Sequence, residues 1–164
     1  MTHVFHRYPK VTMPTVSHGD GCYLIDTDGK RYFDGSCGAA VSCLGHSDRT
    51  VTEAIKAQLD KVPLGYSGFF TSEPMEELAD ILAELAPGNL NHVYFVSGGS
   101  EAMESAIKLA RQYALEKGEP KRHHIIARRQ SYHGNTLGAL ATGGNQWRRE
   151  PFSPLMIETT HISP

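Results

Sequence analysis

Long hydrophobic runs and an excess of charge of either sign are missing from this chain. No apolar stretch approaches the ~20 residues that a membrane-spanning helix needs, and the first twenty residues hold no apolar run of signal-peptide length. The 16 basic and 18 acidic side chains leave a net charge of −2, which gives no field that favours nucleic acid or an anionic membrane. We therefore expect a cytoplasmic protein that binds neither nucleic acid nor membranes.

Cysteine is scarce as well. The three cysteines, Cys22, Cys37 and Cys43, lack a Cys-x-x-Cys spacing, so the sequence predicts reduced thiols rather than a disulfide framework. Cys43 and His46 have a spacing that a metal ion accepts, but two residues do not make a zinc site, and no metal is expected. The pairs Arg128-Arg129 and Arg148-Arg149 are interpreted as solvated surface charge.

The N-terminal third predicts a hairpin followed by a helix. Residues 22–34 are interpreted as two short strands around Asp28-Gly29, a pair that supplies the positive φ values of a tight turn. Ser47-Asp48 offers a cap for a helix that Pro63 ends. The apolar stripe of this helix is expected to pack in a core and comprises Val51, Ala54, Ile55, Leu59 and Val62.

The middle of the chain predicts a loop and a second amphipathic helix. Residues 64–71 combine two glycines with aromatic side chains, which favours a buried or interfacial loop. Ser72 caps the next helix, Pro74 lies in its first turn, and Pro87-Gly88 stops it. Its apolar stripe comprises Met75, Leu78, Ile81, Leu82 and Leu85.

The remaining sequence predicts an α/β arrangement. Strands are expected at 93–96 and 124–127, with a helix from about Ser100 between them, so that the two strands are parallel. A short helix is expected at 135–141, then a loop containing two glycines and two prolines, and Leu155 to Thr159 is expected to begin another strand. Glu104 and Lys108 lie one turn apart and are interpreted as a surface ion pair.

The junction Ser97-Gly98-Gly99-Ser100 between a strand and a helix suits a phosphate. Two glycines let the backbone turn and approach a ligand closely, and the free N–H groups and the positive end of the helix dipole face an anion. Ser100 adds a hydroxyl donor or a helix cap. Neither G-x-x-x-x-G-K-[ST] nor G-x-G-x-x-G is present at this junction, so the phosphate belongs to something other than a nucleotide.

Two motifs around this junction carry a family resemblance. Residues 97–111 read SGGSEAMESAIKLAR, and Ser131-Tyr132-His133-Gly134-Asn135-Thr136 follows the apolar run 125–127. With Gly45-His46 and Phe70-Thr71-Ser72 upstream, the chain resembles the class III pyridoxal-phosphate-dependent aminotransferases over nearly its whole length.

The resemblance implies a cofactor site. Gly98, Gly99 and Ser100 are expected to hold the phosphate of pyridoxal 5′-phosphate, and Tyr132 to lie against its ring. The resemblance also implies a fold-type I PLP-transferase, with residues 1–62 forming a hairpin and helix segment of the small domain. Residues 63–164 would form the first part of the large domain, with a mostly parallel sheet.

The family's Schiff-base lysine and pyridine-binding aspartate lie downstream of the Tyr-His-Gly turn, in a part that this sequence does not contain. Every lysine here precedes that turn, at 10, 30, 56, 61, 108, 117 and 121. We expect the N-terminal part of an aminotransferase, either truncated or one half of a split enzyme with a complementary C-terminal chain, and expect the isolated chain to be inactive and to associate. The substrates would be an amino donor and a 2-oxo acid, and the complete enzyme a homodimer. The alternative is a non-catalytic phosphate-binding or interaction module.

Overall fold

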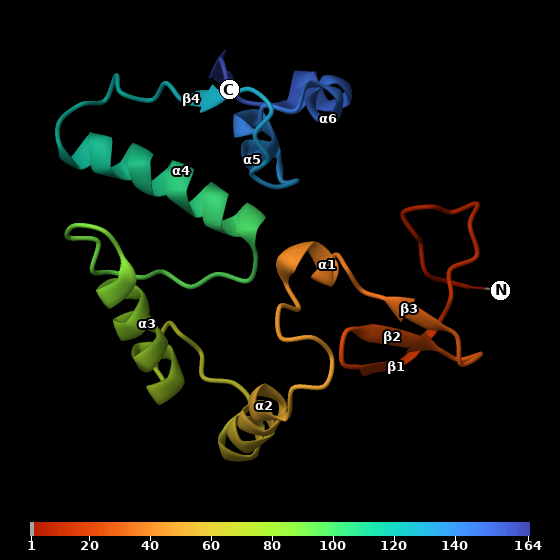
Figure 1. Ribbon diagram of the computed structural model, residues 1–164. Coiled ribbons are helices and arrows are strands. Elements are labelled where there is room, and N and C mark those ends of the chain that lie inside the picture. The colour runs from red at the N-terminus through yellow and green to blue at the C-terminus, as the bar shows by residue number, and fades with distance from the viewer. Residues whose placement is uncertain (1) are drawn as a thin grey trace. The chain divides into compact units, whose positions relative to one another are not determined.

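The computed structural model describes residues 2–164. The chain divides into two compact units, the first ending at Glu73 and the second comprising Pro74–Pro164 (Figure 1). The domain boundary expected between residues 62 and 63 stays a prediction. In the part of the chain that the structure describes, no helix is both long and apolar enough to cross a membrane.

The first unit is built on a small antiparallel sheet. The expected hairpin is confirmed, with β2 (Tyr23–Asp26) paired to β3 (Arg31–Phe33). A further strand that the sequence did not reveal, β1 (Val16–Asp20), pairs with the other edge of β2. β1 has one β-branched residue, Val16, and therefore lacks the alternating apolar pattern by which a strand is recognised.

Asp26 holds the hairpin turn together. One carboxylate oxygen accepts hydrogen bonds from the backbone N–H groups of Asp28 (3.0 Å) and Lys30 (2.9 Å), while the other accepts from the Tyr32 hydroxyl (2.8 Å). The Tyr32 hydrogen bond is the main reason that the pKa of Asp26 lies below its ordinary value. Gly29 has a φ of +81°, as the predicted turn requires.

A left-handed turn follows the sheet. α1 (Cys37–Ala40) has positive φ at every position, from +50° at Cys37 to +66° at Ala40, an arrangement that is rare for residues with a Cβ. Asp34 stabilises this turn because its carboxylate accepts the Cys37 N–H (2.9 Å) and lies 2.9 Å from Nε2 of His46. The hydrogen bond with His46 is the largest of the causes that lower the pKa of Asp34.

The first long helix is confirmed, but its expected burial is not. α2 (Arg49–Lys61) begins after Asp48, whose carboxylate accepts from the N–H groups of Thr50 (2.8 Å) and Val51 (3.2 Å). Its apolar stripe is exposed, with Ile55 at 55%. The loop 64–71 is exposed too, so it is not buried within this chain, and its place at an interface stays a prediction. An apolar stripe marks the face that another surface would cover. No other described part of the first unit covers α2 or the loop 64–71.

The second unit begins with the two longer helices α3 (Glu73–Leu85) and α4 (Gly99–Glu116). Both were expected from their sequence. The strand expected at 93–96 does not form, and these residues run without regular structure. A strand needs a hydrogen-bonded neighbour, and none of the described strands pairs with 93–96.

The parallel pairing that does form lies further along the chain. β4 (Ile126–Arg128) pairs in parallel with β5 (Thr160–Ile162), in the register Ile126 to Thr160. Between them lie α5 (Leu137–Thr142), α6 (Gln146–Arg149) and the 3-10 helix η1 (Glu150–Leu155). The short helix was expected near this place. The loop expected after it was wrong, since Pro151 suits the first turn of η1, and the last strand begins later than expected.

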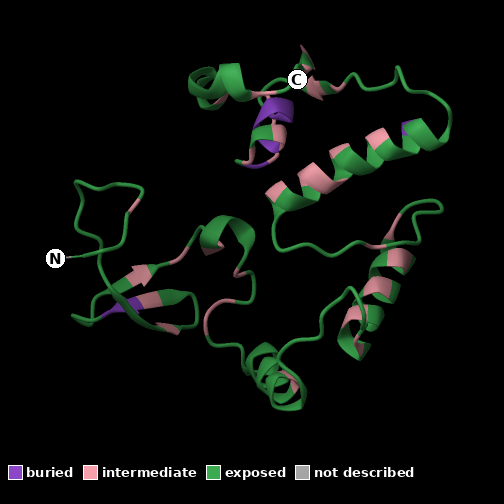
Figure 2. Ribbon diagram, turned by 180° about the vertical axis from the view of Figure 1, so that it is seen from behind, coloured by how far each residue is buried: buried purple, intermediate pink, exposed green. Residues whose placement is uncertain are grey.

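The buried residues of the second unit gather at α5. Ala139 and Ala141 are fully buried, Leu140 is 8% exposed and Thr142 is 1% exposed. Figure 2 shows α5 as the main buried segment of this unit. The core of the second unit therefore lies where α5 meets α4 and α6.

Candidate cofactor-binding site

The N-terminus of α4 provides unpaired backbone donors. Gly98 is the N-cap residue, with an extended backbone (φ −166°) and no side chain bonded to the helix end. The first N–H groups of a helix have no partner within it, and the helix dipole adds positive charge there. Neither Gly98 nor Gly99 has a positive φ, so the glycines are not needed for a left-handed turn. A Cβ at either position would meet no atom within 4 Å, which leaves open space against the amides.

Ser100 faces the loop after β4 rather than capping its own helix. Its hydroxyl oxygen accepts a hydrogen bond from the backbone N–H of Asn135 (3.0 Å) and lies 3.4 Å from the Asn135 side-chain oxygen. Of the two roles that the sequence left open for Ser100, the helix cap is therefore wrong. The hydroxyl instead joins the two segments that the sequence singled out.

Gly134 makes this approach possible. Its φ is +132°, a conformation that side chains disfavour, and a Cβ there would lie 2.8 Å from the Ser100 Cα. Only glycine fits at this contact. As a result, the Tyr132–Gly134 turn rests directly against the first turn of α4.

The two segments line an open hollow of about 550 Å³, a size typical of small-molecule sites. It brings together Gly99, Ser100 and Tyr132, and Gly98 adjoins it as the N-cap residue. No lysine and no carboxylate line the hollow, whose complete lining is Gly99, Ser100, Ala102, Met103, Tyr132, His133 and Gly134. Open amides and an aromatic ring fit a phosphorylated planar cofactor, and the groups that would react with it are not among these residues.

Tyr132 is 61% exposed and has a cation on its ring. The Arg148 guanidinium lies 5.2 Å from the centre of the Tyr132 ring and 4.4 Å from that of Trp147. Arg148 is exposed, as expected for surface charge, but its stacking on Tyr132 left no signal in the sequence.

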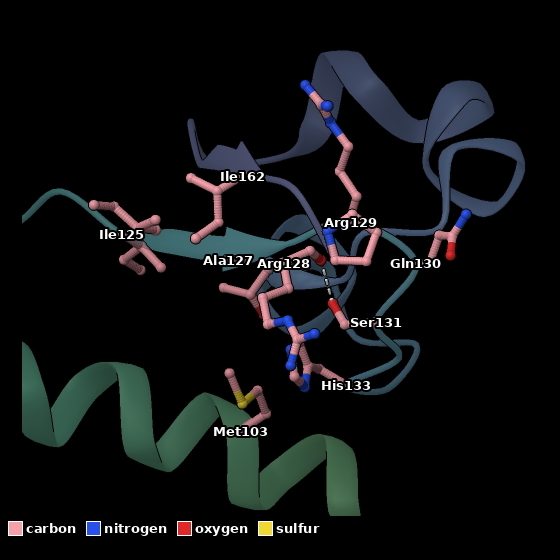
Figure 3. A pocket seen from close by; sticks show the side chains of 12 residues that line it. Met103, Ile125, Ala127, Arg128, Arg129, Gln130, Ser131, His133 and Ile162 are labelled. Atoms are coloured by element: carbon pink, nitrogen blue, oxygen red, sulfur yellow. Dashed lines mark hydrogen bonds between the residues drawn. The ribbon is translucent and has the colours of Figure 1, made fainter.

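A second hollow of about 630 Å³ adjoins the first and shares Met103 and His133 with it (Figure 3). Its wall includes the end of β4, where the Ser131 hydroxyl donates to the Arg128 carbonyl (2.6 Å) and accepts from the Gly144 N–H (3.1 Å). These bonds fix the point at which the chain leaves the sheet for Tyr132. This hollow exposes the side of a two-stranded sheet and contains none of the expected site residues.

Glu104 corrects another expectation. Its carboxylate forms no ion pair with Lys108 and instead accepts hydrogen bonds from the Thr136 hydroxyl (2.6 Å) and the Ala139 N–H (3.1 Å). The Thr136 hydrogen bond is the largest of the causes that lower the pKa of Glu104, and Lys108 is the smallest. Glu104 thus binds the start of α5 rather than solvent.

The sequence of this chain matches a known protein family. The family described as Aminotransferase class-III matches residues 5–164. The chain is 48% identical to an uncharacterized aminotransferase, YodT, of Bacillus subtilis, over 92% of this chain and 34% of the relative. It is 39% identical to the acetylornithine aminotransferase of Methanopyrus kandleri, over 96% of this chain and 38% of that protein.

Solved structures agree. An adenosylmethionine-8-amino-7-oxononanoate aminotransferase from Methanocaldococcus jannaschii superposes with a TM-score of 0.92 at 32% identity, over 100% of this chain and 38% of the other. An (S)-enantioselective omega-transaminase from Thermomicrobium roseum superposes with a TM-score of 0.90 at 37% identity, over 99% of this chain and 37% of the other. The chain thus spans just over a third of the length of these proteins. It belongs to the class III aminotransferases, a family that depends on pyridoxal 5′-phosphate.

Proposed function

We propose that this chain forms the phosphate-binding portion of an aminotransferase that moves an amino group between an amine or amino acid donor and a 2-oxo acid. One observation carries the proposal: the first turn of α4 and Tyr132, far apart in sequence, line one hollow. Family membership supports the reaction class.

Each part of the hollow has a role that its chemistry suits. The backbone N–H groups at Gly98, Gly99 and Ser100 donate to the phosphate oxygens, and the dipole of the 18-residue helix α4 stabilises the negative charge. Tyr132 packs on one face of the cofactor ring and limits its tilt. When bound, the cofactor supplies an electron sink for the chemistry at the amino group.

The reacting groups would come from elsewhere. A Schiff-base lysine and a carboxylate at the pyridine nitrogen are needed, and neither residue type lines the hollow. The extra length of the relatives is a ready source for both. We therefore infer that the isolated chain binds the cofactor noncovalently and does not turn over substrate.

Substrate choice is proposed only as a class. The relatives' names include acetylornithine and adenosylmethionine-8-amino-7-oxononanoate, and one solved relative is an omega-transaminase. All of these relatives are named as aminotransferases or transaminases, and their names differ in the substrate that they give. For this chain the proposal is an amine or ω-amino acid donor with a 2-oxo acid acceptor.

The exposed apolar surface supports a complementary polypeptide as partner. On α2 the side chain of Ile55 is 55% exposed, and on α3 those of Leu78 and Ile81 are each 46% exposed. A C-terminal segment of the same enzyme would cover such apolar side chains. A homodimer of the complete enzyme and a cytoplasmic location are part of the proposal and derive from the family resemblance and the composition.

A chimera tests the proposal. Residues 1–164 are joined to the part of the Bacillus subtilis relative that lies beyond the matched region, and conversion of the cofactor to its amine form is followed by absorbance with a panel of amines. We expect the chimera to convert cofactor and the isolated chain to be inactive. Turnover by the isolated chain, with a borohydride-reducible lysine adduct, would contradict the assignment of the lysine to another segment.

The alternative is a non-catalytic module that keeps the phosphate cradle. The lack of lysine in the hollow is the observation that favours it. An inactive chimera whose phosphate cradle still binds pyridoxamine 5′-phosphate would support this alternative.

A further inference from the structure

We propose that Glu104 is a positioning residue for the cofactor ring: from the second turn of α4 it fixes the loop that presents Tyr132. The inference rests on the proposed function, because Tyr132 matters only if the hollow binds a planar cofactor. Nothing about the lysine or the substrate is needed for it.

The contacts of Glu104 all lie on the segment just after Tyr132. Its carboxylate accepts from the Thr136 hydroxyl at 2.6 Å and from the Ala139 N–H at 3.1 Å. Hydrogen bonds to a carboxylate are shorter and stronger than those between neutral groups. The N-cap residue Thr136 makes no side-chain bond to its own helix, so Glu104 takes the place of that cap.

Ser100 and Glu104 lie one helical turn apart on α4 and therefore share a face. Ser100 accepts the Asn135 N–H at 3.0 Å, directly beside the Thr136 bond made by Glu104. One face of α4 thus binds consecutive residues of the loop, with phosphate binding at its first turn and loop binding at its second.

Two glycines allow the loop to approach this face. A Cβ on Gly134 would lie 2.8 Å from the Ser100 Cα, and one on Gly138 would lie 2.7 Å from Oε1 of Glu104. The glycines at 134 and 138 therefore match Ser100 and Glu104 in order along the helix. This correspondence makes the contact a built interface rather than a chance hydrogen bond.

Tyr132 is consequently held between two fixed points. Before it, Ser131 is bound to the Arg128 carbonyl and to the Gly144 N–H. After it, Asn135 and Thr136 are bound to α4. Removing the Glu104 carboxylate releases Thr136 from α4. The ring of Tyr132 then has more orientations available when the cofactor binds.

The test separates ring binding from phosphate binding. The full chain is titrated with pyridoxamine 5′-phosphate, which cannot form a Schiff base with surface lysines, and separately with inorganic phosphate. Binding is followed by two-dimensional amide NMR, which also reports whether each variant is folded. The variants are Glu104→Ala, Glu104→Gln and, as a matched control on the same helix, Glu116→Gln, whose side chain is exposed.

Glu104→Ala is expected to lower the affinity for pyridoxamine 5′-phosphate about tenfold, which corresponds to the net contribution of one strong hydrogen bond. Inorganic phosphate should bind within about twofold of the original chain, because the amides at the start of α4 are unchanged. Glu104→Gln keeps an acceptor oxygen and should recover most of the affinity. Glu116→Gln should leave the affinity for both ligands unchanged.

Three results would overturn the inference. They are an unchanged affinity of Glu104→Ala for pyridoxamine 5′-phosphate, an equal loss of affinity for both ligands in that variant, and an affinity of Glu104→Gln as low as that of Glu104→Ala. If the original chain binds neither ligand, the proposed function fails instead. Hydrogen exchange at the Ala139 amide then still decides the local claim, because Glu104→Ala should speed exchange there and Glu116→Gln should not.

Discussion

The helices α3 and α5 belong to the same unit and differ in a way that length does not explain. α3 has 13 residues and an apolar stripe whose members Leu78 and Ile81 are both 46% exposed. α5 has only 6 residues, yet Leu140 is 8% exposed and its alanine neighbours are fully buried. The shorter helix is thus the one that is packed.

The difference lies in how each helix is attached. Side chains from other segments bind the two ends of α5: Glu104 accepts from its first turn, and His161 Nε2 lies 3.0 Å from the Gly143 carbonyl after its last turn. The stripe of α3 is hydrophobic but half exposed. The corner that carries the candidate site is therefore packed by residues of the second unit itself, whereas the long amphipathic helices present surfaces suited to a partner polypeptide.

The largest expected effect is that of Gly134→Ala. The added Cβ would meet Ser100, and the alanine backbone would have to keep the φ of +132° that Gly134 has. Overpacking and backbone strain each cost roughly 1–3 kcal/mol, so we expect a total of about 3 kcal/mol. Amide hydrogen exchange across 134–142 measures the loss.

Gly118→Ala serves as the control for this substitution. Gly118 has a φ of +73°, and a Cβ there would meet nothing within 4 Å, so only the backbone strain remains. We expect about 1 kcal/mol from that strain. Equal effects at 134 and 118 would mean that the contact with Ser100 contributes nothing.

A pair of leucine substitutions tests the comparison directly. Leu140→Ala should cost about 3 kcal/mol, as expected for a buried leucine. Leu78→Ala, at a half-exposed position, should cost less than about 1 kcal/mol. Denaturation of each variant by urea gives the two values, and similar losses would show that α3 is as well packed as α5.

Acid should loosen both units at the turns held by carboxylates. The pKa values of Asp26, Asp34 and Glu104 all lie below their ordinary values of 3.8, 3.8 and 4.5. A lowered pKa means that the stabilisation is fully present above the ordinary value and is lost as the pH falls through the folded value. NMR titration from pH 6 to 2 should therefore show little change above about pH 5, where unfolded carboxyl groups are ionised.

Replacement of Arg148 by Gln should have the smallest effect. A cation on an exposed aromatic ring contributes roughly 0.5–1 kcal/mol, which corresponds to a two- to fivefold loss of pyridoxamine 5′-phosphate affinity if the stacking restrains Tyr132. Arg129→Gln is the control, because the cation on the Tyr132 ring is Arg148 and not Arg129. A loss greater than tenfold would indicate that Arg148 touches the ligand itself.

The sequence predicted the parts of the site that depend on local pattern. The glycine turn, the helix after it and the hairpin turn at Asp28-Gly29 were recognisable from composition and periodicity, whereas the Tyr132 motif was recognised through the family resemblance. The hydrogen bonds by which Glu104 holds the loop after Tyr132 could not be predicted from the sequence, because Glu104 looks like any residue on the polar side of a helix. Its partner Thr136 is remote in sequence, and nothing in the spacing reveals the pairing.

Other failures have the same physical cause. Residues 93–96 have strand composition, but a strand exists only when another pairs with it. The stripe of α2 has core composition, but burial depends on a covering surface. The left-handed turn at Cys37–Ala40 has only Gly38 as a local signal, and Asp34 stabilises it through a hydrogen bond to Cys37.

One titration tests the central claim most directly. Pyridoxamine 5′-phosphate is added to the full chain while the backbone amides of residues 98–100 and the ring protons of Tyr132 are followed by NMR. We predict that both sets of signals shift with one dissociation constant, whereas inorganic phosphate shifts the amides alone. Signals that stay unchanged at these positions while the ligand binds elsewhere would contradict the account.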